Sequence, residues 1–148
     1  MQSINQSQYI LEIVNRFRLS DAHPMHTPLP SGAEVHLVKY DGEATAHKIK
    51  HYQQIIGSLL YVQIGTRLDI SFTVAHLAQY AFNPSVQHLR LAKYVLSYLK
   101  GMADLQLCYN GASGNGLVSF LDSSYGDQAD DYHSTSGYVY LLANGAIS

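Results

Sequence analysis

No apolar run in this sequence reaches membrane-spanning length, and Met1-Gln2-Ser3 lacks the basic and then apolar order of a signal peptide. Cys108 is the single cysteine, so no disulfide can form within the chain, which fits a reducing compartment. We therefore expect a soluble, intracellular chain with no membrane partner. Its 148 residues, 47% of them hydrophobic, suffice for one core, or for one small domain and part of a second.

Lysine and arginine are absent from residues 101–148, which carry five aspartates and a net charge of −5. Residues 1–100 hold all nine Lys and Arg against six acids, which gives +3. Because phosphate binding requires basic groups, any nucleic-acid surface is expected in the first part. The second part is better suited to cations.

Metal-ligand motifs are also missing. Two histidine pairs lack a third ligand at motif spacing, which favours surface histidines over zinc: His23 with His26, and His47 with His51. Three acids follow Asp122 within nine residues but do not have the spacing of a calcium loop: Asp127, Asp130 and Asp131. A solvated acidic loop is favoured there over a weak Mg²⁺ or Ca²⁺ site.

Three apolar stripes with helical spacing occupy residues 52–101 and predict a bundle of three short helices. Asn83-Pro84-Ser85 supplies an N-cap and a proline that fits a first helical turn, and Lys100-Gly101 a cation and a glycine suited to a left-handed helix end. Gly57-Ser58 predicts a close contact between helices, because glycine otherwise weakens a helix. Arg67 and Asp69 flank a helix start, which favours structural pairing over catalysis.

The remaining segments complete an α+β class. Residues 6–17 predict an amphipathic helix capped by Asn5 or Ser7, and residues 20–45 an extended connector with a short strand around Val35–Val38. Alternating or apolar runs predict strands in 105–109, 117–122 and 137–142, and Asn144-Gly145 a hairpin turn into a third sheet strand that starts at Ala146. We divide the chain into an N-terminal helix with its connector (1–45), a helical bundle (46–101) and a truncated sheet (102–148).

Four separate motifs within residues 52–101 resemble the segment that follows the polymerase active site in copia-type LTR retrotransposon polyproteins. The family reads Tyr-x-x-x-Ile/Val-Gly-Ser-Leu-Leu-Tyr, Thr-Arg-Pro-Asp-Ile-x-Phe, Asn-Pro-Thr/Ser-x-x-His and a basic helix ending Tyr-Leu-Lys-Gly. These words match, in order, Tyr52–Tyr61, Thr66–Phe72, Asn83–His88 and Tyr98–Gly101. Leu68 and Leu89 depart from a family proline and tryptophan. The resemblance implies a small, thumb-like helical bundle followed by a ribonuclease H-like sheet.

The ribonuclease H resemblance rests on residues 120–138, where Ser134-Thr135-Ser136-Gly137-Tyr138 matches the family word. It implies that Asp122 is the first catalytic carboxylate and a ligand of Mg²⁺ or Mn²⁺ in the parent enzyme. Ser124 and Tyr125 replace a second Asp and a Trp, and Tyr132-His133 replace a basic pair. One strand-borne carboxylate cannot hold two metals, and the polymerase's Tyr-x-Asp-Asp word is absent. We expect no cofactor and no catalysis from this chain alone.

The candidate nucleic-acid surface is the helix over residues 86–99. Four cationic or titratable residues lie off its apolar stripe, with Tyr94 and Tyr98 nearby: His88, Arg90, Lys93 and Lys100. The resemblance implies that they contact an RNA–DNA or DNA primer–template, while an ordinary solvated helix face has the same pattern. The alternative function is a host-recruited retrotransposon remnant that binds a protein partner.

Other expected partners are the rest of the polyprotein and, through unpaired strand edges, a second copy of this chain. The parent element is expected in the cytoplasm, within virus-like particles, or in the nucleus.

Overall fold

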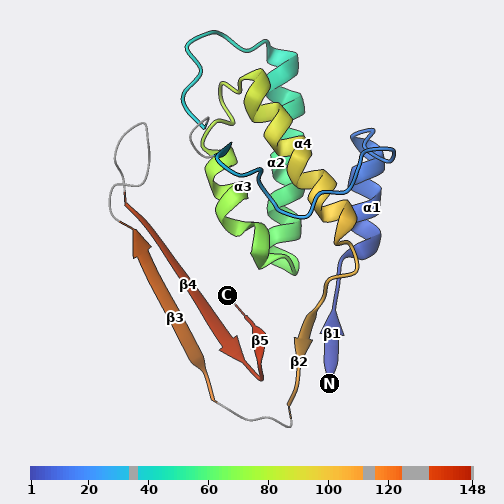
Figure 1. Ribbon diagram of the computed structural model, residues 1–148, viewed down its shortest axis with the longest axis vertical. Helices are drawn as coiled ribbons and strands as arrows, with labels where there is room; N and C mark the ends of the chain where they lie inside the picture. Colours follow the sequence, from blue (N-terminus) through green and yellow to red (C-terminus); the bar gives the residue numbers. More distant parts are fainter. Residues whose placement is uncertain (34–36, 112–115, 125–133, 148) are drawn as a thin grey trace. The chain divides into compact units, whose positions relative to one another are not determined.

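The computed structural model describes residues 1–33, 37–111, 116–124 and 134–147. It confirms the α+β class, with four α-helices and small antiparallel sheets in the described residues (Figure 1). Contacts between residues divide the chain into two compact units, residues 6–105 and residues 1–5 together with 106–148. The boundaries that we placed at residues 45 and 101 stay predictions. No helix in the described part of the chain is both long and apolar enough to cross a membrane.

The first unit is helical, and its helices lie where the apolar periodicity predicts them. Its elements are α1 (Ser7–Arg16), α2 (Ala46–Gly65), the 3-10 helix η2 (Leu68–Ile70), α3 (Ser71–Ala78) and α4 (Val86–Gly101). Thr45 caps α2 by accepting a hydrogen bond from the Lys48 amide, and Ser85 caps α4 in the same way from the His88 amide. The predicted role of the Asn83-Pro84-Ser85 segment as a cap is therefore confirmed, although Pro84 precedes the helix rather than entering its first turn.

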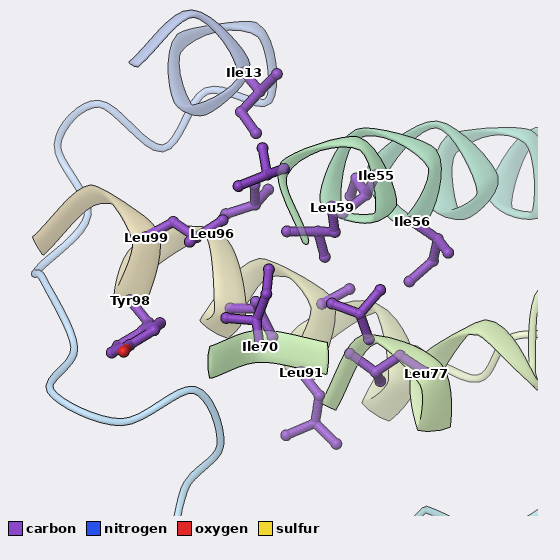
Figure 2. Packing of buried hydrophobic residues seen from close by; sticks show 14 of the residues in the cluster. Ile13, Ile55, Ile56, Leu59, Ile70, Leu77, Leu91, Leu96, Tyr98 and Leu99 are labelled. Atoms are coloured by element: carbon purple, nitrogen blue, oxygen red, sulfur yellow. The ribbon is translucent and has the colours of Figure 1, made fainter. Parts of the chain in front are cut away.

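The core of this unit forms where the apolar faces of the helices meet (Figure 2). Ile13 of α1, Leu59 of α2, Leu77 of α3 and Leu96 of α4 are each fully buried. Helix α1 packs against α4, and α4 also packs against α2 and α3. Burial of each of these aliphatic side chains stabilises the fold by about 1.5–3 kcal/mol. Because α4 contacts all three other helices, it is the central helix of the unit.

Two expectations at helix ends are wrong. Gln6, rather than Asn5 or Ser7, occupies the N-cap position of α1, and its side chain instead accepts a hydrogen bond from the Thr66 hydroxyl at 2.8 Å. Gly101 is the last residue of α4 and does not adopt a left-handed conformation. Its lack of a side chain serves packing, because a Cβ there would lie 2.8 Å from Cβ of Pro24.

The close helix contact expected at Gly57 is also wrong. A Cβ added to Gly57 would meet no atom within 4 Å, and the residue is exposed. The neighbouring Ser58 is buried and donates its hydroxyl hydrogen bond to the Gln54 carbonyl of its own helix at 3.0 Å. Glycine at position 57 therefore has no packing reason in the described structure.

The second unit holds the strands. β1 (Gln2–Ile4) pairs antiparallel with β2 (Leu107–Tyr109), a pairing that the sequence analysis missed. β3 (Val118–Ser124), β4 (Thr135–Leu142) and β5 (Gly145–Ala146) form a second antiparallel sheet in that order. Among the described residues β3 pairs only with β4, with Asp122 opposite Gly137. Self-association through the other edge of β3 stays a prediction.

The predicted hairpin into a third sheet strand is confirmed, but its turn lies one residue earlier than expected. Ala143 and Asn144 are the two turn residues, and both have positive φ, as a type I′ turn requires. Gly145 is already in β5, where a Cβ would collide with the Tyr109 ring and the Cys108 carbonyl. The strand expected around Val35–Val38 falls partly outside the described residues, and Leu37 and Val38 are not in a strand.

Candidate nucleic-acid interface

Arg90 and Lys93 keep the positions expected of a nucleic-acid surface. They lie three residues apart on α4, so their side chains leave neighbouring points of one helix face. Arg90 is exposed and Lys93 half-buried, and no carboxylate of the described residues lies within 4.0 Å of either charge. Their charges are therefore available to a phosphate.

Helix α2 adds titratable groups beside Lys93. The pKa of the His51 imidazole lies below its ordinary value, because the side chain is partly buried and because Lys93 and His47 add positive charge nearby. The His51 ring also meets the Phe17 ring edge-on, with centroids 5.9 Å apart. The lowered pKa favours the neutral imidazole, so His51 places a polar ring beside Lys93 but adds no fixed positive charge to it.

His88 does not lie on the exposed face of α4, so that expectation is wrong. Its side chain is fully buried, with Nδ1 accepting a hydrogen bond from the Ser85 amide at 3.1 Å. The ring stacks on Tyr80, with centroids 4.0 Å apart and planes 18° apart. His88 completes the cap of α4 and joins α4 to the turn that follows α3, and its buried imidazole is shielded from any phosphate backbone.

Lys100 is engaged by the connector. Its amine donates hydrogen bonds to the carbonyls of Ser20 and Ala22, the latter at 2.8 Å. The Met25 amide donates to the Ser97 carbonyl at 3.3 Å, and the hydroxyls of Thr27 and Tyr94 lie 3.4 Å apart. Residues 20–27 therefore lie along the C-terminal half of α4. The basic face expected to run from His88 to Lys100 is reduced to Arg90 and Lys93.

Arg67 and Asp69 form an ion pair, and the predicted structural pairing is confirmed. Arg67 is 1% exposed; its Nε and Nη2 donate to the two Asp69 carboxylate oxygens at 2.9 and 2.8 Å. Its Nη1 donates to the Met102 carbonyl at 2.7 Å, and the Tyr98 hydroxyl donates to Asp69 at 2.7 Å. The cluster joins the start of η2 to the end of α4.

Asn83 fixes the turn between α3 and α4. Its side-chain amide donates to the carbonyls of Tyr40 and Gly42 at 3.2 and 2.8 Å, and its carbonyl oxygen accepts from the Ala44 amide at 2.9 Å. Phe82, immediately before it, is 86% exposed. A helix pattern does not specify which residues of the following turn face solvent, so the exposure of Phe82 could not be predicted from the sequence.

Asp122 lies in the middle of β3 and is exposed. In the described residues no three His, Cys, Asp or Glu side chains gather as a metal site, so these residues do not fit a two-metal centre. Asp127, Asp130 and Asp131 lie outside the described residues, as do Tyr125, Tyr132 and His133. The catalytic and metal roles of Asp122 stay predictions.

Two plant transposon proteins align with nearly the whole chain. It is 32% identical, over 98% of its length, to the retrovirus-related Pol polyprotein from transposon RE1 of Arabidopsis thaliana. It is 29% identical, again over 98%, to the Pol polyprotein from transposon TNT 1-94 of Nicotiana tabacum. The chain belongs to the copia-type retrotransposon Pol polyproteins.

This copia-type segment spans only 10% of the RE1 polyprotein and 11% of the TNT 1-94 polyprotein. It is also similar to a shorter protein, secreted RxLR effector protein 161 of Plasmopara viticola, at 31% identity over 66% of the segment and 68% of that protein. No family model matches the copia-type segment. No solved structure matches it either.

Proposed function

We propose that this copia-type Pol segment follows the polymerase active site of a reverse transcriptase and contacts the primer–template through α4. In this proposal the helices of residues 46–101 act as a thumb-like bundle, and β3, β4 and β5 are the start of a ribonuclease H-like sheet. The observation that carries the proposal is the pair Arg90 and Lys93, two cations on one helix face beside His51. Such a surface suits a phosphate backbone, whose affinity for protein depends on basic side chains.

We expect the double substitution Arg90→Glu with Lys93→Glu to weaken binding of an RNA–DNA hybrid at least about tenfold at low salt, since two phosphate contacts become repulsive. Fluorescence anisotropy with a labelled hybrid at several salt concentrations measures the loss, and the salt dependence should also become shallower. The matched control is Arg16→Glu with Arg18→Glu. It makes the same charge change at two exposed positions at the end of α1. Equal weakening by the two double variants would show that only net charge matters and would overturn the proposal.

We also propose that the segment has no polymerase or ribonuclease activity by itself. It lacks the Tyr-x-Asp-Asp word, and Asp122 is one carboxylate where a two-metal nuclease needs several. Incubation with a primer–template and with an RNA–DNA hybrid, in Mg²⁺ or Mn²⁺, should give no extension and no cleavage. Turnover of either substrate that disappears in Asp122→Asn would contradict this expectation.

A second candidate function is a recruited retrotransposon remnant that binds a protein. The similarity to a protein named as a secreted effector, over 68% of its length, favours this candidate, because related sequence there stands outside a long polyprotein. The hybrid-binding experiment separates the two candidates. Binding that is absent, or that is indifferent to Arg90 and Lys93, favours the protein-binding remnant.

A further inference from the structure

The turn between α3 and α4 presents a large apolar side chain to solvent. Phe82 is 86% exposed, and Val86, the first residue of α4, is 60% exposed. Full burial of a phenylalanine is favourable by about 1.5–3 kcal/mol, so the folded chain forgoes this gain at position 82. An aromatic ring in this position has a free face for a ligand.

The exposure of Phe82 comes from a fixed turn. The Ala81 carbonyl accepts a hydrogen bond from the Gln53 side chain at 3.0 Å, and the Asn83 side chain makes the three bonds to the connector described above. Pro84 is buried, and the capping bonds between Ser85 and His88 follow directly. Phe82 is therefore held between anchored residues, so the entropy lost when a ligand binds it is small.

Charge around the turn indicates the chemistry of that ligand. Val86, Arg90 and Lys93 follow one another at intervals of four and three residues, so they share one face of α4 that starts next to Phe82. Asp41 and Glu43 are exposed on the connector, on either side of the Gly42 carbonyl that Asn83 binds. A polyanion approaching the turn is thus repelled by the connector and attracted along α4.

We propose that Phe82 stacks on an unpaired base of a nucleic acid whose phosphate backbone follows Arg90 and Lys93. The inference rests on the proposed function of α4 and adds to it a contact with a base. Every nucleobase has a π-face, so the contact needs no particular sequence. An apolar pocket of a protein would suit Phe82 alone, but the adjacent cationic face favours a polyanion.

The test uses the whole chain and three labelled RNA–DNA hybrids, one blunt, one with a four-nucleotide single-stranded overhang, and one whose overhang is abasic. Phe82→Ala should raise the Kd for the overhang hybrid about tenfold. It should change the Kd for the blunt and the abasic hybrids by less than about twofold, because neither offers an unpaired base to stack. Phe82→Tyr should bind as the unaltered chain does, whereas Phe82→Leu should resemble the alanine variant.

Phe72→Ala is the matched control, since Phe72 is also exposed but lies on α3 against the His76 ring. Circular dichroism of each variant confirms that its fold is unchanged. No binding by the unaltered chain overturns both this inference and the proposed function. Sensitivity to Arg90→Glu with Lys93→Glu but not to Phe82→Ala overturns the stacking alone. Equal losses on the normal and the abasic overhang would show that Phe82 makes an apolar contact that needs no base, and would also overturn the stacking.

Discussion

Replacement of Arg67 by alanine is expected to lower the free energy of unfolding of the helical unit by about 3 kcal/mol. Arg67 is 1% exposed and supplies hydrogen bonds to Asp69 and to the Met102 carbonyl. Its removal leaves the Asp69 carboxylate without its cation and a carbonyl at the end of α4 without its donor. The Asp69 side chain is 36% exposed, so water compensates part of the loss, and the lower end of the range for buried pairs applies.

Urea unfolding followed by circular dichroism at 222 nm measures this change in the helices. Arg67→Lys should recover only part of the loss, because an ammonium group cannot donate the two parallel bonds of a guanidinium. Tyr98→Phe, which removes only the hydroxyl bonded to Asp69, should cost about 1 kcal/mol. An Arg67→Ala variant within about 0.5 kcal/mol of the unaltered chain would show that the cluster does not hold η2 to α4.

The same cluster gives the unit an acid-sensitive component of stability. Burial alone would raise the pKa of Asp69, but the hydrogen bonds from Arg67 and Tyr98 outweigh it and hold the pKa below its ordinary value. A carboxylate whose pKa is lower in the folded state stabilises the fold above the unfolded pKa, about 4. This stability is lost as the pH falls from about 4 through the folded pKa. Urea unfolding repeated at several pH values below about 5 measures this loss, which should be absent from Asp69→Asn.

Local sequence information sufficed for the helices and for much of the hairpin. Apolar residues at three-to-four spacing marked α1, α2, α3 and α4, and Ser85 marked the start of α4. The pairing of β1 with β2 was not predictable in this way, because it joins three-residue segments about a hundred residues apart. Gly57 and Gly101 were misread for a related reason, since only the folded chain shows which glycine another segment approaches.

The binding face was predictable only in part. A helical pattern separates residues of the apolar stripe from the rest, but it does not show what covers the rest. On α4 the connector covers Lys100, and Tyr80 of the turn after α3 covers His88, so two of four predicted positions are engaged by the chain itself. Arg90 and Lys93 lie off the apolar stripe, and no carboxylate of the described residues forms an ion pair with either of them. Such cover is a tertiary property and needs the structure.

The second large effect is expected at His88, where the sequence pattern and the structure predict different outcomes. His88→Ala should lower the free energy of unfolding by about 3 kcal/mol, because it removes a fully buried ring from its stack on Tyr80 and one half of the capping box. His88→Gln should lose less, since glutamine can still accept the Ser85 amide bond from this position. Urea unfolding of the unaltered chain, His88→Gln and His88→Ala should give free energies of unfolding that decrease in that order.

Arg90→Ala is the crossed control, two residues further along the same helix and exposed. It should change stability by less than about 0.5 kcal/mol while weakening hybrid binding, whereas His88→Ala should do the reverse when binding is measured well below its unfolding midpoint. The two readouts thus separate a residue that holds α4 in place from one that contacts the ligand. If His88→Ala kept the midpoint and reduced binding as much as Arg90→Ala, the imidazole would have to reach the nucleic acid, and its burial against Tyr80 could not be the state that binds.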